Sequence, residues 1–304
     1  GDFRTALVGA TADNYDVANA PATIVNTSVF WRNAWKYQDR AYRHAFWDSG
    51  TILANTLAVA ASHSLSASVV TGFVDESVNR VVDIDGSKEA ALFLVPIGYA
   101  PSMCASIADA PDRVRLETLP YSPQEIRYPL IQSTHLASSL MDTDEVETWR
   151  MSAFTSTPST PGGDVKPLEV PPKSFLLPES VDEVILRRGS TRRFQETSIT
   201  YEDLSTMLAT VREGGVRDYA EDVGASLNDI YLIVNAVDGL PSGTYVYYRR
   251  SQKLELLHEH GYRDEAGHLG LDQALARDAS VNVYFMSDLN HVLENLGPRG
   301  YRAA

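Results

Sequence analysis

The sequence predicts a protein of mixed α and β structure, in which antiparallel or mixed sheets are flanked by helices. Three observations carry this prediction: short β-rich runs alternate with helical patterns, one helical pattern extends over residues 42–62, and a stretch rich in Pro, Ser, Thr and Gly divides the chain. The chain has 304 residues, of which 44% are hydrophobic and 22% charged, and this is enough material for about two domains.

The first part of the chain contains two predicted strands, residues 23–28 and 91–97, on either side of the predicted helix over residues 42–62. The proline-rich stretch has little to bury and favours extended backbone, so we interpret residues 151–175 as a linker. The predicted organisation is therefore one domain over residues 1–150, the linker, and a second domain over residues 176–304.

The second part opens with two helix starts. Residues 180–183 (Ser-Val-Asp-Glu) form a capping box, and residues 200–203 (Thr-Tyr-Glu-Asp) begin another helix. Three strands follow, with a Gly-Leu-Pro-Ser-Gly turn at residues 239–243 between the first two: residues 230–234, 244–248 and 281–286.

Charge and composition exclude some classes of protein. The 26 Lys and Arg residues against 40 Asp and Glu give a net charge of −14, which is the wrong sign for non-specific binding to nucleic acid. No run reaches the about 20 apolar residues that a membrane span needs. The single cysteine, Cys104, suits a reducing compartment, and we expect a cytoplasmic protein. The start, Gly-Asp-Phe-Arg, lacks an initiator Met, and we expect the sequence to begin within a longer protein.

An internal repeat is visible in the sequence. The pattern Arg-x-Tyr-Arg at residues 40–43 recurs at residues 299–302, an offset of 259 residues (302 − 43 = 259). The same offset maps Phe-Arg at residues 3–4 onto Tyr-Arg at residues 262–263 without gaps. We therefore predict two tandem, partial repeats.

Two basic clusters are candidate binding sites. The first combines cations with aromatic side chains and suits a flat anionic cofactor or an acidic peptide; if the segment is one helix, its cations share a face. The alternative is a solvated basic face over core aromatics. Its members are Arg32, Lys36, Arg40 and Arg43, with Trp31, Trp35 and Phe46.

The second cluster covers residues 187–193 (Arg-Arg-Gly-Ser-Thr-Arg-Arg), whose guanidinium and hydroxyl groups could surround a phosphate. The alternative is a set of cations that complements the dipole at a helix C-terminus. His258 and His260 lack a cysteine or carboxylate set with metal-ligand spacing, so no metal site is predicted. No Walker glycine loop, GxGxxG, Gly-x-Ser-x-Gly or His-Glu-x-x-His motif occurs.

These motifs, taken in order, resemble a known family. Residues 188–194 followed by 200–204 resemble the opening of a nitroreductase-superfamily flavin domain, and residues 42–50 through 71–73 resemble its second half. More narrowly, Trp-Lys-Tyr at residues 35–37 ahead of the Arg-x-Tyr-Arg pattern resembles the SagB-type dehydrogenases, which oxidise azoline rings in ribosomal peptides.

The resemblance implies a nitroreductase-like α+β fold and an FMN cofactor. Residues 1–150 would be the C-terminal half of a first such domain and residues 176–304 the N-terminal half of a second, so a complementary chain or a homo-oligomer would complete the flavin site. The roles implied for single residues are these: Arg188, Ser190 and Arg192 bind the flavin phosphate, Gly72 and Phe73 lie near the isoalloxazine, and Lys36 and Tyr37 take part in proton transfer.

The function implied is FMN-dependent dehydrogenation of azoline rings in a peptide to azoles. The alternatives are an NAD(P)H-dependent nitro or quinone reductase acting on a small molecule, and a cofactor-free peptide-binding module. Two departures from the family pattern bear on this choice. Lys36 and Tyr37 correspond to Asn295 and Leu296 in the second copy, and the family's Pro-Ser-Gly flavin loop is reduced at residues 224–227.

Overall fold

The computed structural model describes residues 3–99, 104–105, 115–119, 122–152, 160–172, 179–211, 217–219 and 227–304. It divides into two compact units, which are described separately. Unit 1 spans residues 1–154, 215–223 and 289–304, and unit 2 spans residues 155–214 and 224–288.

Unit 1 is built from an antiparallel pair of strands, the long helix α4 and several short helices. Its strands are β1 (Ala22–Val29) and β2 (Glu89–Ile97). Its helices are α1 (Arg4–Ala10), α2 (Tyr15–Asn19), α3 (Trp31–Tyr37), the 3-10 turn η1 (Gln38–Arg40), α4 (Ala41–Ser62), α5 (Asp75–Val81), α6 (Pro129–Ala137), α7 (Thr143–Arg150), α12 (Leu289–Leu296) and α13 (Gly300–Ala303). Both predicted strands and the predicted long helix are confirmed.

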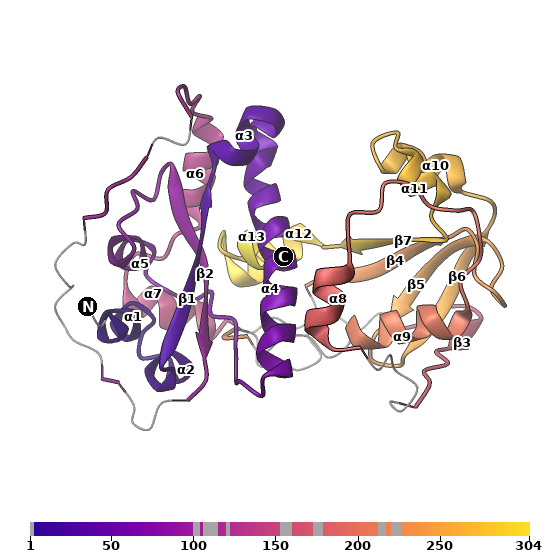
Figure 1. The fold of residues 1–304 in the computed structure, drawn as a ribbon, viewed down its shortest axis with the longest axis horizontal. Helices are drawn as coiled ribbons and strands as arrows, with labels where there is room; N and C mark the ends of the chain where they lie inside the picture. Colours follow the sequence, from indigo (N-terminus) through magenta and orange to yellow (C-terminus); the bar gives the residue numbers. More distant parts are fainter. Residues whose placement is uncertain are drawn as a thin grey trace. The chain divides into compact units, whose positions relative to one another are not determined.

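Strand β2 forms the centre of unit 1 because it is buried on both faces. Ala91 and Leu94 pack with residues of α1, α2 and α5, whereas Leu92 and Val95 pack with residues of α4. Helices α1, α2 and α5 accordingly lie on one side of the β1–β2 pair and α4 on the other (Figure 1). The apolar run Ala-Ala-Leu-Phe-Leu-Val in the sequence is what a strand covered on both faces requires.

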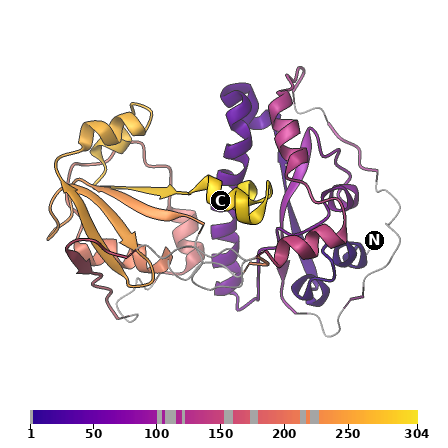
Figure 2. The same ribbon diagram turned by 180° about the vertical axis from the view of Figure 1, so that it is seen from behind.

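Unit 2 is a five-stranded sheet in the order β3-β6-β5-β4-β7, with all neighbours antiparallel. Its strands are β3 (Val165–Pro167), β4 (Asp229–Val234), β5 (Gly243–Tyr248), β6 (Lys253–Glu259) and β7 (Val281–Met286), and its helices are α8 (Val181–Arg187), α9 (Tyr201–Val211), α10 (Arg263–Leu269) and α11 (Ala274–Asp278). Figure 2 shows the sheet from the opposite side. The three predicted strands are confirmed as β4, β5 and β7.

Helix α9 closes one face of this sheet. Its residues Leu204 and Leu208 are buried against Ile230, Leu232 and the rest of the unit 2 core. The capping box predicted before α8 is confirmed, because the Ser180 hydroxyl accepts from the N–H of Glu183 and the Glu183 carboxylate accepts from the N–H of Ser180.

The range interpreted as a linker contains strand β3, which pairs with β6 at the edge of the sheet. Proline at its end, Pro167, is tolerated there because an edge strand has one unpaired side. Unit 1 also takes up residues 289–304, which lie within the range predicted for the second domain. The assignment of the two ranges to halves of two nitroreductase-like domains stays a prediction.

The repeat offset relates secondary structure as well as sequence. Shifted by this offset, the bounds of α1 and α2 coincide with those of α10 and α11, and β1 overlaps β7. Helix α3 corresponds in the same way to α12, and the first residue of α4 corresponds to the first residue of α13.

The glycine that begins β5 has no room for a side chain, and this predicts the cost of adding one. A Cβ at Gly243 would collide with the backbone carbonyl oxygen of His258 on the neighbouring strand β6. We expect Gly243→Ala to lower the free energy of unfolding by about 1 to 3 kcal/mol, measured by urea denaturation. Gly189→Ala, where a Cβ meets nothing within 4 Å, is the control, and equal losses in both variants would contradict the packing argument.

Candidate functional site

The loop predicted to bind a phosphate follows helix α8 in unit 2. Arg188, Ser190 and Arg192 are exposed, and a side chain added at Gly189 would meet nothing within 4 Å. The side chains of Arg188 and Arg192 have no hydrogen-bond or ion-pair partner among the described residues, whereas the Arg187 side chain is held in an ion pair of 2.7 Å with Glu179. Two guanidinium groups and a hydroxyl are therefore available to an anion.

Gly72 and Phe73, the residues predicted to lie near a flavin ring, are both buried in unit 1. The N–H of Gly72 donates to Asp218 Oδ2 at 2.8 Å, and a Cβ at this position would lie 2.9 Å from the same oxygen and 3.1 Å from Arg150 Nε. The ring of Phe73 is covered by the Arg299 guanidinium, 4.7 Å from the ring centroid. In this chain both residues are occupied by packing and hydrogen bonding within unit 1.

Lys36 and Tyr37, the predicted proton-transfer pair, lie at the end of α3. The Lys36 side chain is exposed, with Nζ 5.1 Å from the centroid of the Tyr37 ring. Tyr37 stacks on His44 with centroids 4.2 Å apart, and partial burial together with Arg40 lowers the pKa of His44. The four cations would share a helical face only if the segment were one helix, and this condition is not met, because α3 ends here and Gln38 has a φ of 52°.

The predicted site residues thus fall in both units. Lys36, Tyr37, Gly72 and Phe73 belong to unit 1, and the arginine loop belongs to unit 2. Residues 224–226, part of the reduced flavin loop, lie outside the described residues. The roles of these side chains in binding and catalysis stay predictions.

Unit 1 contains a buried ionic centre that the sequence analysis did not single out. The carboxylate of Asp75 at the start of α5 forms ion pairs with Arg299 Nη1 at 2.7 Å and with Arg302 Nη1 at 2.6 Å, and all three side chains are buried. Asp75 Oδ2 also accepts from the N–H of Leu140 at 2.9 Å. One carboxylate therefore joins α5, the end of α6 and the C-terminal helices.

The two guanidinium groups are satisfied by further acceptors. Arg299 Nε donates to the carbonyl of Thr71 at 2.8 Å, and its Nη1 donates to the carbonyl of Ser138 at 3.0 Å. Arg302 Nε donates to Ser138 Oγ and its Nη2 donates to the carbonyl of His135, both at 2.8 Å. These additional acceptors explain how two guanidinium groups can be buried beside a single carboxylate.

The charges of this centre shift the pKa values of its members. Burial alone would raise the pKa of Asp75, but the guanidinium groups of Arg299 and Arg302 outweigh it and hold that pKa below its ordinary value. Burial, assisted by Arg302, lowers the pKa of His135 to about 3, so this imidazole is neutral. Burial also raises the pKa of Tyr42, whose hydroxyl lies 3.0 Å from Ser138 Oγ.

The two copies of the Arg-x-Tyr-Arg pattern, residues 40–43 and 299–302, are in contact beside this centre. Tyr42 of the first copy and Tyr301 of the second, which the offset makes equivalent, stack with centroids 6.0 Å apart and planes at 15°. Arg43 Nε donates to the Tyr301 hydroxyl at 3.3 Å. The pattern was visible in the sequence, but no motif marks Asp75 as its partner, because Arg299 lies 224 positions further along the chain.

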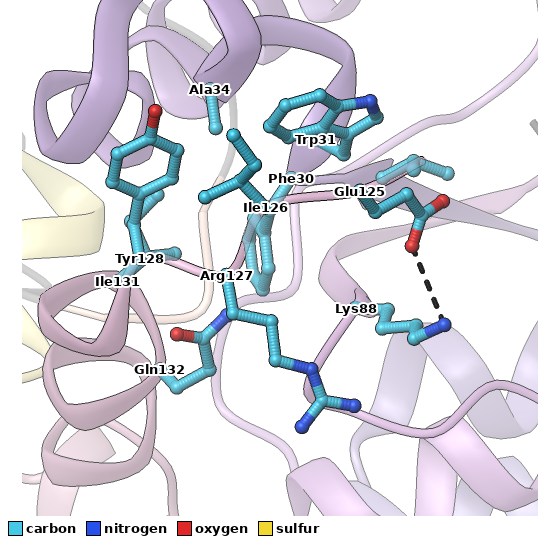
Figure 3. A pocket seen from close by; sticks show the side chains of 11 residues that line it. Phe30, Trp31, Ala34, Lys88, Glu125, Ile126, Arg127, Tyr128, Ile131 and Gln132 are labelled. Atoms are coloured by element: carbon cyan, nitrogen blue, oxygen red, sulfur yellow. Dashed lines mark ion pairs between the residues drawn. The ribbon is translucent and has the colours of Figure 1, made fainter. Parts of the chain in front are cut away.

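A small pocket lies between β1, α3 and the segment before α6. Figure 3 shows Phe30, Trp31 and Ile126 around it, with the ion pair of Lys88 and Glu125 at 3.3 Å beside them. Its volume of about 20 Å³ is comparable to the space that one water molecule needs. It is too small for a flavin ring.

A larger open groove of about 990 Å³ lies next to this pocket. Its lining includes Asp83, Asp85, Glu89 and Glu125 against one cation, Lys88. Four carboxylates beside one ammonium make this groove unsuitable for a phosphate-bearing cofactor.

Comparison with known proteins agrees with this architecture. Residues 5–99 match the nitroreductase family. The crystal structure of a "putative nitroreductase" from Anabaena variabilis matches with a TM-score of 0.74 and 24% sequence identity, covering 99% of this chain and 62% of that chain. The chain has a nitroreductase-like α+β fold. It spans 62% of the length of the Anabaena protein. No curated protein matches the chain.

Two negative observations concern the described part of the chain. A membrane-spanning helix, which would need about 20 mostly apolar residues, is not found among the helices of this part. The same residues hold no group of three or more His, Cys, Asp or Glu side chains arranged to bind a metal ion.

The shared carboxylate predicts a large effect of its removal. Asp75→Asn keeps the shape of the side chain but leaves two buried guanidinium groups without a counter-charge, so we expect a loss of about 3 to 5 kcal/mol in the free energy of unfolding, measured by urea denaturation. Glu76→Gln is the matched control, because Glu76 is exposed and its ion pair with Arg80 is a surface pair. An Asp75→Asn variant as stable as the parent would contradict this account.

The neutral histidine predicts a pH dependence of stability. The pKa of His135 is about 3 in the folded protein and about 6.5 in an unfolded chain, so between these values the unfolded state binds one more proton. Stability should therefore fall as pH decreases below about 6.5, with His135 contributing up to about 1.4 kcal/mol per pH unit. The lowered pKa of Asp75 adds a further loss of stability at lower pH.

The measurement is chemical denaturation between pH 4 and pH 7 with the parent and His135→Gln. The variant should show a shallower slope over this range, because its side chain does not titrate there. Equal slopes would assign the pH dependence to other groups.

Proposed function

We propose that this protein is an FMN-dependent oxidoreductase of the SagB type, which dehydrogenates azoline rings in a ribosomal peptide. The observation that carries the flavin part is the arginine loop in a nitroreductase-like fold: the side chains of Arg188 and Arg192 are exposed and have no hydrogen-bond or ion-pair partner among the described residues. Their donor groups, with the hydroxyl of Ser190, are the chemistry that a phosphomonoester requires.

The fit of the chain to FMN differs between the two ends of the cofactor. The arginine loop fits the phosphate. Gly72 and Phe73 are covered by Asp218, Arg150 and Arg299, so these two residues would contact a flavin ring only if those side chains moved. A flavin ring would therefore rest on other groups, and we propose that a complementary chain or a second copy supplies them.

When bound, FMN would accept a hydride from the substrate carbon. The second product of azoline dehydrogenation is a proton, and the groups of this chain proposed to handle it are Lys36 and Tyr37. A lysine can act as a base near neutral pH only if desolvation or neighbouring cations lower its pKa. Because Lys36 is exposed, a bound peptide would have to provide the desolvation.

The exposure of Lys36 also favours a second candidate, an NAD(P)H-dependent nitro or quinone reductase. Such a reaction takes its proton from water and needs no desolvated lysine. A third candidate, a cofactor-free module that holds a precursor peptide, is favoured by the exposed rings of Trp35 and Trp47, which lie among the cations of α3 and α4 and are 62% and 57% exposed.

We further propose that the chain carries parts of two tandem nitroreductase-like domains. Support comes from the repeat offset, which relates the bounds of α1 and α2 to those of α10 and α11. The length of the Anabaena protein, of which this chain covers 62%, supports a longer tandem arrangement.

The phosphate assignment is tested by FMN titration of the intact protein, followed by flavin fluorescence. Arg188→Ala and Arg192→Ala each remove a charge-assisted hydrogen bond worth about 1.5 to 3 kcal/mol, so each should weaken FMN binding by about tenfold to a hundredfold. Arg187→Ala removes the same charge beside the same loop, but Arg187 is already paired with Glu179 and should have little effect. If all three variants weakened FMN binding equally, the effect would come from the net positive charge of the loop and not from direct contacts of Arg188 and Arg192 with the phosphate.

The proton-transfer assignment is tested by turnover of a peptide azoline with FMN-loaded protein. General-base catalysis contributes about 10² to 10⁴ in rate, so Lys36→Ala should retain its flavin and lose at least about a hundredfold in turnover. Arg80→Ala, which removes an exposed cation of α5 outside this cluster, is the control. Full activity of Lys36→Ala would remove the azoline mechanism and favour the reductase.

A further inference from the structure

Two histidines at the end of β6 lie on one face of the strand. His258 is within β6 and His260 directly follows it, where its N–H donates to the carbonyl of Ser242 at 3.1 Å and extends the ladder with β5 by one residue. Because side chains alternate along a strand, residues 258 and 260 share a face. Their ring centroids are 6.3 Å apart, and both side chains are exposed.

Tyr262 contacts both imidazoles. Its hydroxyl lies at hydrogen-bond distance, 2.8 Å, from Nδ1 of His258, and its ring centroid is 5.1 Å from that of His260, with the planes at 78°. Among the described residues, neither imidazole makes another hydrogen bond or an ion pair. The hydrogen bond with Tyr262 uses Nδ1 of His258, so Nε2 is the nitrogen of this ring that remains for a ligand.

The hydroxyl of Tyr262 is not needed for the helix that follows it. The repeat offset maps Tyr262 onto Phe3, and the two residues occupy the same position, directly before α10 and α1. An aromatic ring without a hydroxyl is therefore sufficient at this helix start. In the second copy the added hydroxyl contacts His258, which indicates that it serves the imidazole.

The spacing of the two rings suits one metal ion between them. A histidine nitrogen coordinates such an ion at about 2.0 to 2.1 Å, which places the ion about 3.2 Å from the ring centroid. At a tetrahedral angle, two coordinating rings would have centroids about 5.2 Å apart. The rings at 6.3 Å would therefore have to approach each other by about 1 Å, which a small rotation of two exposed side chains supplies.

We propose that His258 and His260 bind a divalent ion of the late first-row metals, such as Ni²⁺, Cu²⁺ or Zn²⁺, through one nitrogen each. Imidazole is a preferred ligand of these ions. Tyr262 is the positioning residue, because a hydrogen bond to the second ring nitrogen orients a metal-binding histidine and fixes its tautomer. The described residues offer this pair no third His, Cys, Asp or Glu, so water would fill the remaining positions.

The experiment is isothermal titration of the intact chain with NiCl₂. We expect saturable binding of one Ni²⁺ at this site. Tyr262→Phe keeps the ring and removes the hydroxyl, so it should weaken Ni²⁺ binding by about tenfold to a hundredfold. His258→Ala and His260→Ala should each weaken it further, because each removes a ligand.

Two controls separate this site from general attraction of cations to an acidic chain. His268→Ala should leave the Ni²⁺ affinity unchanged, since His268 is an equally exposed histidine whose Nδ1 is paired with Asp272. Titration with MgCl₂ should give no binding that depends on His258 or His260, because Mg²⁺ prefers oxygen ligands.

The role of Tyr262 has a spectroscopic test with Zn²⁺, which is diamagnetic. In the Zn²⁺-loaded chain, the ring nitrogen shifts of His258 should show the metal on Nε2 and a proton on Nδ1. The melting temperature of metal-free Tyr262→Phe should equal that of the parent, as the phenylalanine at the equivalent position predicts. A loss of affinity would then reflect the orientation of the ligand and not unfolding.

Three results would overturn the proposal. They are the absence of saturable Ni²⁺ binding, Ni²⁺ affinities of His258→Ala and His260→Ala equal to that of the parent, and coordination of Zn²⁺ by Nδ1 of His258. The second result would assign the metal to other side chains. None of these measurements requires flavin, so failure here would leave the proposed oxidoreductase activity untouched.

Discussion

The carboxylate of Asp75, shared by Arg299 and Arg302, is the interaction on which the arrangement of unit 1 depends. Removing three ionised groups from water is costly, and two cations on one anion leave a net positive charge in the interior. The arrangement is stable because the remaining guanidinium protons reach backbone carbonyls and the hydroxyl of Ser138. Such a centre specifies one geometry, since any displacement leaves several buried donors unpaired at once.

The ionic centre also fixes the positions of the neighbouring helices α12 and α13. Helices α12 and α13 have only eight and four residues, lengths at which an isolated helix does not persist in water. They are fixed by Arg299 and Arg302, by the stacking of Tyr301, and by the indole N–H of Trp149, which donates to the carbonyl of Leu296 at 3.1 Å. The cover over Phe73 follows from the same guanidinium.

Local patterns in the sequence predicted much of the fold. The capping box before α8, the length of α4 and the three apolar strands of unit 2 each depend on neighbouring residues, and each is confirmed. Strand β6 was not predicted, because two consecutive leucines, Leu256 and Leu257, break its alternation of polar and apolar residues (Lys-Leu-Glu-Leu-Leu-His-Glu). The nitroreductase-like architecture came from the resemblance of motifs and their order.

The ionic centre could not be predicted from local sequence patterns, because Asp75 and its two arginines are 224 and 227 positions apart. Asp75 lies in the first turn of a helix, where acidic residues are common. No neighbouring residue in the sequence indicates that it pairs with two guanidinium groups. The interruption after α3 could not be derived from residue types either, because Gln38 has a φ of 52°, a value that non-glycine residues seldom adopt. The arginine loop, by contrast, was readable because all of its members are adjacent in sequence.

The long separation between Asp75 and its arginines also has a consequence for how the chain folds. The ion pairs join residues 224 and 227 positions apart, with all of unit 2 between them. On a ribosome, unit 1 remains incomplete until α13 has emerged, so unit 2 can acquire its structure before unit 1 does. Closing so long a loop is slow, although the entropic cost of closure grows only with the logarithm of loop length. A unit 2 that has already folded shortens the effective loop. We therefore expect unit 2 to fold before unit 1, although most of unit 1 comes first in the chain.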